Sequence, residues 1–527
     1  MGKRSTTEFN VFLIIVDLIF SWSRMLLALG LSILFSLTVG ILAARNKKAE
    51  SVVVPLLDVF QSIPILGFFP IVVFGVIAVF PGAIGVNLAV IILIFTSMSW
   101  NIAFGVYEAV KSIPQDYIDL SQISQSSAWH RITSLYIPAS LSRIAYNTQT
   151  SWAVGLFYLI SSEIISLGQT DKSVHYGIGV AIINFSNTQD WTGYAYSIIA
   201  LILAVIIWQF VFLREFALWS ERYKFAEDSR GVQKDALMRF YSWINHRSIS
   251  KLFLLTQGRG VTRFSSSLSR FRKGLKYVLA IIVGIFVILE IGAIASLSAS
   301  LTHLPSLEVI ASEEVSVVVA LAYSFVRVWY VYLICVGVAI PLGISVALNR
   351  RLYDAASPTL EVIASVPAPA LLPLIVEVLH RNGEAVAAVI IFLGMFWYVV
   401  FNVMVGVRSL PSDLFELQRE FMVSRWQAWR NIYLPATITA FVTGSITAIG
   451  AAWNTLIVAE YFQVAGSPVE TQVNIGIGKT IALATQSQNL LVLTLSVLSM
   501  TALIVVFNLT VWRRVYHYTT KKYAYNR

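Results

Sequence analysis

Two acidic residues, Glu163 and Glu460, lie late in long apolar stretches of the sequence and occupy matching places in them. A carboxylate at membrane depth is a candidate functional group by default, so we interpret both as candidates for a translocation pathway or its gate. The alternative is that both lie near the outer surface of a membrane and meet water. Carboxylates repel anions, so we do not expect these two to bind an anionic substrate directly. Pro64 and Pro367, each closing a Ser-x-Pro element, are further pathway candidates.

A short glycine-rich segment, GIGKT at residues 476–480, has the look of a phosphate-binding loop. Such a loop needs another glycine five residues before Gly478, and that position is Val473. The matching place in the first half of the chain, residues 177–180, reads GIGV without the lysine. We therefore assign the glycine pair to an internal repeat and expect no ATPase site in this chain.

Other chemistry is poorly supported by the sequence. No nucleophile–base pair stands out, the six histidines are scattered without metal-ligand spacing, and the single cysteine, Cys335, lies in an apolar run. We expect no catalytic residue, no metal site and no cofactor, and we do not expect an enzyme.

The elements that position these residues are those of a membrane bundle. The chain has 527 residues, of which 57% are hydrophobic and 13% charged, whereas soluble domains have about 25% charged residues. The net charge of +10 is best explained by basic loops beside anionic lipid headgroups, rather than by a nucleic-acid surface. We predict an all-α, multi-pass protein of the cell membrane that contacts lipid and does not bind nucleic acid.

A membrane span needs about 20 mostly apolar residues. The sequence predicts eleven, at residues 24–44, 54–80, 86–107, 140–166, 193–214, 277–298, 316–347, 358–379, 385–407, 437–461 and 489–512. Residues 11–22 are too short to cross alone and are predicted to extend the first helix or to lie along the interface. Lys and Arg gather in alternate loops and in the C-terminal tail, so that side is predicted to be cytoplasmic and the N-terminus outside.

An internal repeat runs through the chain. The element Ser62-Ile63-Pro64 recurs as Ser365-Val366-Pro367, an offset of 303 residues (367 − 64). Farther along, the offset becomes 297 residues (435 − 138). Tryptophans, prolines and acidic residues of the first copy recur at this offset in the second. Self-similarity of this kind indicates two copies of one structural unit. Six residues are missing from the second copy, at a place where a loop can absorb the loss at small entropic cost.

Each copy has five core spans, and an odd number would invert the second copy if the copies were joined directly. The unmatched span at 277–298 restores the orientation, so the copies are predicted to be parallel. The predicted organisation is a first repeat at 1–214, a basic cytoplasmic linker at 215–276, the extra span at 277–298 and a second repeat at 299–527. The linker is interpreted either as a surface-lying helix or as a plain tether.

One loop recurs in both copies, at residues 116–140 and 413–437. Each opens after a proline, is predicted to form a short polar helix, and closes at Pro138 or Pro435, where a proline suits the first turn of the next helix. Both expose a tryptophan, Trp129 or Trp426. The alternative of two ordinary loops is weakened because the framework of tryptophan, acid and proline repeats.

These loops resemble the EAA motif of ATP-binding cassette (ABC) importer permeases of the MetI-like fold. Asp119 and Glu416 fall on the glutamate of the motif, and Pro138 and Pro435 fall on its end. The segment SRWQAWRNIYLPA at residues 424–436 is similar to nitrate, sulfonate and taurine permeases. Two positions depart from the motif, because its glycine is replaced by Gln125 in one copy and Met422 in the other. That glycine permits a tight turn, so the departure bears on the geometry of the loop.

The resemblance implies a fused, two-copy permease subunit that imports a small anion by alternating access. It implies that the loops dock on two copies of a cytoplasmic ABC ATPase, and that an extracytoplasmic substrate-binding protein delivers the solute. The implied docking residues are Asp119, Gln125, Trp129, Pro138, Glu416, Met422, Trp426 and Pro435. Iron(III) permeases are also fused duplicates, so a cation substrate stays open within this family. An ion-coupled secondary transporter and a membrane-embedded enzyme are the alternatives outside it.

Overall fold

The computed structural model describes residues 11–62, 64–124, 127–164, 174–223, 307–410, 414, 420–463 and 470–523. The first copy contains α1 Val11–Arg45, α2 Lys47–Ser62, α3 Ile65–Val79, α4 Ala83–Lys111, α5 Gln115–Ile123, α6 Ala128–Arg131, α7 Ile137–Ile164, α8 Ile178–Asn187, α9 Trp191–Ile207 and α10 Arg214–Ser220. The second contains α14 Leu307–Leu348, α15 Arg350–Ala364, α16 Ala368–Val378, α17 Gly383–Arg408, α19 Arg425–Ala428, α20 Leu434–Glu460, β1 Tyr461–Gln463, β2 Glu470–Gln472, α21 Ile477–Gln486, α22 Leu490–Phe507 and α23 Arg513–Tyr523.

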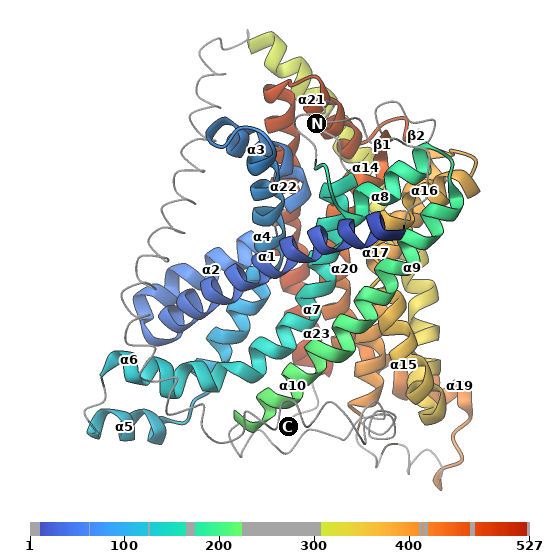
Figure 1. Cartoon of the computed structure of the whole chain (residues 1–527). Helices are drawn as coiled ribbons and strands as arrows, with labels where there is room; N and C mark the ends of the chain where they lie inside the picture. Colours follow the sequence, from blue (N-terminus) through green and yellow to red (C-terminus); the bar gives the residue numbers. More distant parts are fainter. Residues whose placement is uncertain are drawn as a thin grey trace.

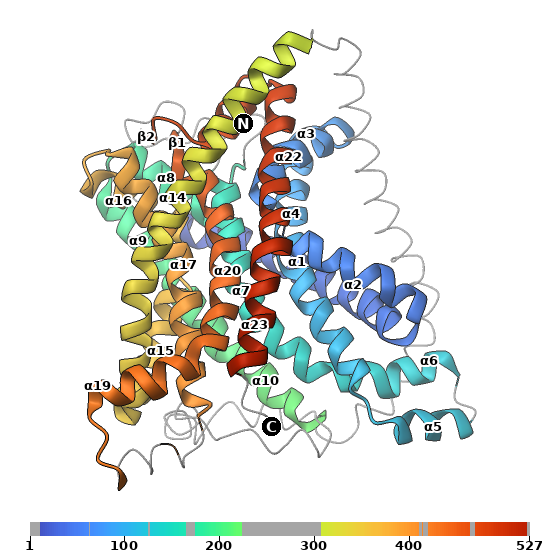
Figure 2. The same ribbon diagram turned by 180° about the vertical axis from the view of Figure 1, so that it is seen from behind.

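The copies are parallel, as predicted (Figures 1 and 2). The short helices α5, α6 and α19 lie at one end of the molecule together with the C-terminal end of α23, whereas α8, α21 and the β1–β2 hairpin lie at the other. We call these the loop end and the opposite end. Within the copies the packing repeats, because α1 packs on α4 and α4 on α7, while α14 packs on α17 and α17 on α20. The core is formed by the apolar faces of these helices.

Seven described helical segments are long and apolar enough to cross a membrane. They are Val11–Arg45, Ala83–Lys111, Trp191–Ser220, Val315–Leu348, Gly383–Arg408, Trp426–Glu460 and Leu490–Tyr516. Residues 11–22 extend the first of these helices, one of the two predicted possibilities. The predicted extra span at 277–298 lies outside the described residues, as does most of the predicted linker. The count of eleven therefore stays a prediction.

The predicted spans at 54–80 and 358–379 are wrong as single helices. Each is divided in two at the Ser-x-Pro element, into α2 and α3 in the first copy and α15 and α16 in the second. The two parts of the second pair meet at an angle of 84°. The cause is the proline, which has no N–H to donate and disfavours helical backbone in the residue before it. Pro64 and Pro367 are themselves extended, with ψ of 98° and 127°.

The short helices that follow these breaks join the two copies. Helix α3 packs on α20 and α21 of the second copy, and α16 packs on α7 and α8 of the first. The Tyr194 hydroxyl of α9 donates to the Ala370 carbonyl at 2.9 Å, and the amide of Leu66 lies 3.5 Å from Oδ1 of Asn454. Each copy therefore contributes one half-helix to the other, and the seam between them is reciprocal.

Candidate functional site

The repeated loop of the first copy forms two short helices at the loop end. Helix α5 begins after Pro114, and Asp119 accepts a hydrogen bond from Nε2 of Gln115 at 2.8 Å. Its outer face presents apolar side chains to solvent, because Leu120 is 62% exposed and Ile123 is 79% exposed. Trp129 lies half-buried on α6, and Gln125 is outside the described residues.

The corresponding loop of the second copy presents a larger exposed apolar surface. Phe421, Met422 and Trp426 are 73%, 90% and 66% exposed, and the Trp426 ring stacks on Trp429 with the ring centres 5.4 Å apart. Glu416 lies outside the described residues. Uncovered side chains of this size at one end of a molecule are typical of a surface that binds another protein.

Pro138 and Pro435 lie in the first turn of α7 and α20, as predicted, although neither helix starts anew there. The chain runs without interruption from α6 or α19 into α7 or α20 through one wider π turn, at Ile132–Tyr136 and Trp429–Tyr433. Pro138 and Pro435 follow these turns directly, half-buried. A proline within a helix lacks its N–H and crowds the preceding turn, and a π turn makes room for it. The short helices α6 and α19 are therefore rigid extensions of the long helices α7 and α20.

Met422, which by the resemblance falls on the glycine of the EAA motif, has a backbone conformation that favours glycine. Its φ is +47°, in the left-handed region where a side chain costs about 1–2 kcal/mol. The tight turn is therefore kept although the glycine is lost. This removes the reason to expect a different loop geometry in the second copy.

Replacing Met422 by glycine is expected to stabilise this loop by about 1 kcal/mol more than replacing it by alanine. Both substitutions remove the exposed side chain, but only glycine relieves the left-handed backbone. Amide hydrogen exchange across residues 420–428 measures the difference, and slower exchange in Met422→Gly than in Met422→Ala is the expected result. Equal exchange rates in the two variants would show that the turn is not strained.

A buried ionic network in the first copy surrounds Glu163 at the opposite end. Its Oε1 accepts hydrogen bonds from Nη1 of Arg24 and Oγ of Ser21, both at 2.6 Å, and its Oε2 accepts from the Gly179 amide at 2.8 Å. Nε of Arg24 donates to Oδ1 of Asn87, and Nη2 donates to the Tyr176 carbonyl. The network joins α1, α4, α7 and the start of α8.

A neighbouring carboxylate completes this network. Asp17, one turn before Ser21 on α1 and 2% exposed, accepts a hydrogen bond from the Gly177 amide at 3.1 Å. The Ser21 hydroxyl accepts from the Ile178 amide at 2.9 Å. Three consecutive amides at the N-terminal end of α8 are thereby bonded to side chains of α1 and α7, the arrangement that a helix N-terminus favours for anions.

The second copy repeats this network. Glu460 accepts from the Arg327 guanidinium, from Oγ of Ser324 at 2.5 Å and from the Gly478 amide at 2.7 Å. The Ser324 hydroxyl accepts from the Ile477 amide at 2.8 Å. Two partners differ. Ala320 stands where the first copy has Asp17, and Glu384 stands where it has Asn87 and binds Arg327 through both oxygens.

The glycine pair that has the look of a phosphate-binding loop serves this network. A Cβ on Gly476 would lie 2.3 Å from Oε2 of Glu460, and a Cβ on Gly478 would lie 2.8 Å from the Leu456 carbonyl oxygen. The glycines let the start of α21 approach α20 closely enough for its amides to reach the carboxylate. Lys479 donates to the carbonyls of Val473 and Asn474 instead. The prediction that the pair belongs to the repeat agrees with this geometry.

Glu163 and Glu460 thus do not meet water, so that part of the alternative is wrong. Both carboxylates are wholly buried, and each is paired with an arginine. The sequence prediction missed Arg24 and Arg327 as their partners. A signal was present, because the two arginines match each other in the repeat and, like the two glutamates, lie in apolar spans where an unpaired charge is costly.

Each copy has one further contact at the loop end. It links α2 to the C-terminal end of α4 in the first copy, and α15 to the C-terminal end of α17 in the second. In the first copy Lys111 binds both oxygens of Glu50 at 2.7 and 2.8 Å, and the Lys111 hydrogen bond holds the pKa of Glu50 below its usual value. In the second copy the matching residues form a cation–π contact, with Arg408 lying 4.8 Å from the ring centre of Tyr353. The same connection is made by different chemistry.

Pro64 and Pro367, the remaining pathway candidates, are both buried. Each precedes the half-helix that crosses to the other copy, α3 or α16. The structure therefore places them at the seam between the copies, apart from the networks of Glu163 and Glu460 within each copy.

Known proteins similar to this chain are membrane components of transport systems. Relatives include a nitrate import permease protein of Leptolyngbya laminosa, 31% identical over 140 residues, which are 27% of this chain and 50% of the relative. A bicarbonate transport system permease protein of Synechococcus elongatus is 30% identical over 26% of this chain and 49% of the relative. A taurine transport system permease protein of Escherichia coli is 29% identical over 27% of this chain and 50% of the relative. The chain spans about half the length of the curated relatives it matches.

The family comparison covers much more of the chain. Residues 36–217 and 339–518 each match the model of the binding-protein-dependent transport system inner membrane component. The two matched stretches correspond to the two structural copies and together include both repeated loops, at residues 116–140 and 413–437. The chain therefore belongs to the family of binding-protein-dependent transport system inner membrane components, of the MetI-like fold, and carries its domain twice.

Proposed function

We propose that this protein is the fused membrane permease of an ABC importer, and that it imports a small inorganic or organic anion. The observation that carries the proposal is the pair of exposed apolar loops at one end of a parallel duplicate. The names of the relatives, which are permeases for nitrate, bicarbonate and taurine, support an anionic substrate.

The loop end, which we place in the cytoplasm, receives two ATPase subunits. Each subunit binds one loop, through Asp119 and Trp129 in the first copy and through Met422 and Trp426 in the second. Because the docking helices continue into α7 and α20, a movement of an ATPase passes directly into the long helices of the bundle. Closure of the two ATPases then moves the copies as rigid bodies, which switches the side to which the passage opens.

The passage runs along the seam where α3 and α16 cross between the copies. A polar side chain lies there in an apolar setting, since Oδ1 of Asn454 of α20 is 3.5 Å from the backbone amide of Leu66. Tyr158 of α7 lies close enough to Tyr398 of α17 for the two phenol groups to interact electrostatically. Amide and hydroxyl donors suit a small anion that must bind weakly enough to leave again. An extracytoplasmic binding protein delivers the anion to the opposite end.

The networks of Glu163 and Glu460 act as positioning groups of the gate rather than as ligands of the anion. Their carboxylates are already occupied by arginine, serine and amide donors. They fix α8 and α21 to the long helices of their own copy. Helix α16 packs on α8, and α3 packs on α21, so the crossing half-helices move with these fixed elements.

A double substitution of Trp129 and Trp426 by alanine tests the docking proposal. Each tryptophan at a protein interface contributes on the order of 2 kcal/mol, so the double variant is expected to bind the ATPase at least about tenfold more weakly. Co-purification of the ATPase and ATP-dependent anion uptake into proteoliposomes measure the effect. The control is Ile84→Ala with Val378→Ala, which removes side chains of 73% and 63% exposure at the opposite end.

Two results would reject the proposal. Intact complex formation and uptake in the double tryptophan variant would show that the loops do not dock. Uptake that persists without any ATPase, driven by an ion gradient, would indicate a secondary transporter. Uptake of iron(III) rather than anions would keep the ABC mechanism but replace the substrate class.

A further inference from the structure

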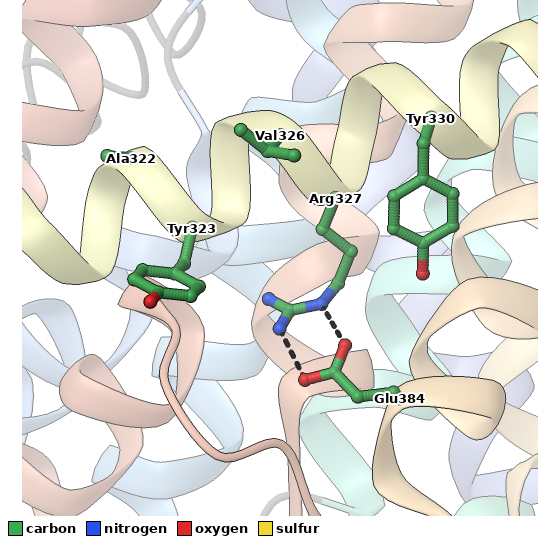
Figure 3. Close-up of a pocket in the computed structure, with 6 residues that line it drawn as sticks. All are labelled: Ala322, Tyr323, Val326, Arg327, Tyr330 and Glu384. Carbon is green, nitrogen blue, oxygen red and sulfur yellow. Dashed lines mark hydrogen bonds and ion pairs between the residues drawn. The ribbon is translucent and has the colours of Figure 1, made fainter.

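One difference between the two copies opens a cavity that the transport function does not explain. An open cavity of about 400 Å³ lies on α14 of the second copy, lined by Ala322, Tyr323, Val326, Arg327, Tyr330 and Glu384. Figure 3 shows the rings of Tyr323 and Tyr330 on either side of the Arg327–Glu384 ion pair, directed to the same side of the helix. Among the described residues, neither the repeated loops nor the crossing half-helices α3 and α16 line this cavity.

The first copy differs from the second at three of the described positions around this cavity. At the matching positions Phe20 replaces Tyr323, Leu27 replaces Tyr330 and Tyr176 replaces Ile475. The Phe20 and Tyr176 rings stack with their centres 5.2 Å apart, at the position that corresponds to the cavity of the second copy. In the second copy Ile475 is too small to do so and is itself 40% exposed.

The charge of the site favours a cation. One guanidinium, that of Arg327, faces two carboxylates, Glu384 and Glu460, so the cluster carries one negative charge in excess. The excess is on the accessible side, because the Glu384 side chain is 46% exposed whereas the Glu460 side chain is fully covered. Tyr330 lies within electrostatic range of Glu384. Tyrosine faces attract ammonium groups, most strongly where water is excluded.

The depth of the site indicates what bears the ammonium group. Helix α14 ends at Leu348, directly before Arg350 and Arg351. The apolar segment Val315–Leu348 is longer than the hydrocarbon core of a bilayer requires. The core is crossed in about 20 residues at about 1.5 Å each, and counting from the basic end at Arg350 places its far boundary near Arg327. Exposed apolar side chains continue toward the loop end from there, with Leu333 66% and Ile334 55% exposed. An acyl chain fits this stripe when its headgroup lies at the cavity.

We propose that this cavity binds the ammonium headgroup of a membrane phospholipid, such as phosphatidylethanolamine, in the leaflet opposite the loop end. Glu384 pairs with the ammonium group, Tyr323 and Tyr330 flank it, and the acyl chains lie along the exposed face of α14. The site belongs to the second copy alone. A bound lipid there stabilises the outer part of α14, which carries Ser324 and Arg327 of the buried network.

The test is lipid retention by the full-length protein, purified from nanodiscs that contain equal amounts of phosphatidylethanolamine and phosphatidylglycerol. Native mass spectrometry is expected to show phosphatidylethanolamine enriched about fivefold in the retained lipid. Three variants take the residue of the first copy at the matching position: Glu384→Asn, Tyr330→Leu and Ile475→Tyr. Each is expected to abolish the enrichment. Because Glu460 still pairs with Arg327 in all three, folding is expected to persist, and a thermal unfolding scan checks it.

The matched control is Asn87→Glu, which adds the carboxylate to the first copy without opening a cavity, and it is expected to add no further enrichment. Equal retention of the two lipids by the unmodified protein would overturn the proposal, as would enrichment that survives Ile475→Tyr. Free ethanolamine that binds without any retained lipid would show that the ligand is a soluble amine. A cross-link from Val326→Cys to segment 277–298 would show that the chain itself covers the site. Either of these last results also overturns the proposal.

Discussion

Replacing Arg24 by methionine is expected to lower the free energy of unfolding by about 3–5 kcal/mol, because it leaves the buried Glu163 carboxylate without its charged partner. Ser21 and the Gly179 amide still donate to Glu163, but neither carries a charge. The loss is comparable to much of the stability of an ordinary domain, so low yield is part of the expected result. Thermal and denaturant unfolding of the detergent-solubilised protein measure it.

Two comparisons make the result specific to the buried pair. Lys111→Met removes an ion pair whose side chains are 48% and 28% exposed, and it is expected to leave the unfolding midpoint nearly unchanged. The double variant Arg24→Met with Glu163→Met is expected to be less destabilised than the sum of the two single variants, since no buried charge is left alone. An Arg24→Met variant as stable as Lys111→Met would contradict the network described here.

The repeat explains why much of this architecture can be predicted from sequence alone. Long apolar segments and matching prolines and tryptophans locate most helices and both loops. The broken spans were missed because a sliding measure of hydropathy does not register a change in chain direction. Yet Pro64 and Pro367 carried the signal, since proline disfavours helix in the residue before it. The partner of Glu163 was missed because Arg24 lies 139 residues away in the chain.

One difference between the copies could not be predicted from the sequence: an asparagine and a glycine that contact each other have changed places between the two helices. In the first copy Asn147 of α7 donates to the Asn101 carbonyl, and Gly105 leaves room for it, since a Cβ there would lie 2.1 Å from Nδ2 of Asn147. In the second copy the roles are reversed, because Asn402 lies on α17 and Gly444 on α20. A Cβ on Gly444 would lie 2.7 Å from Cβ of Asn402. One large and one small residue are kept in each contact, whichever helix carries them.

Gly478→Ala is the second substitution from which we expect a large effect. Its Cβ would lie 2.8 Å from the Leu456 carbonyl oxygen and 2.9 Å from Cα of Ile457, so the clash is with backbone that cannot rotate away. The start of α21 must then move from α20, and the Gly478 amide loses its bond to the buried Glu460 carboxylate. Overpacking together with a lost charged hydrogen bond is expected to cost about 3 kcal/mol.

The control for this prediction lies in the same helix as Glu460. A Cβ on Gly450 of α20 meets no atom within 4 Å, so Gly450→Ala is expected to raise stability slightly, by up to about 1 kcal/mol, through helix propensity. Gly179→Ala, at the matching site of the first copy, is expected to behave like Gly478→Ala because its Cβ would lie 2.8 Å from Cβ of Glu163. If Gly478→Ala unfolded at the same midpoint as Gly450→Ala, α21 would not be held against α20 by the carboxylate. The glycine pair would then need another reason for its presence in both copies.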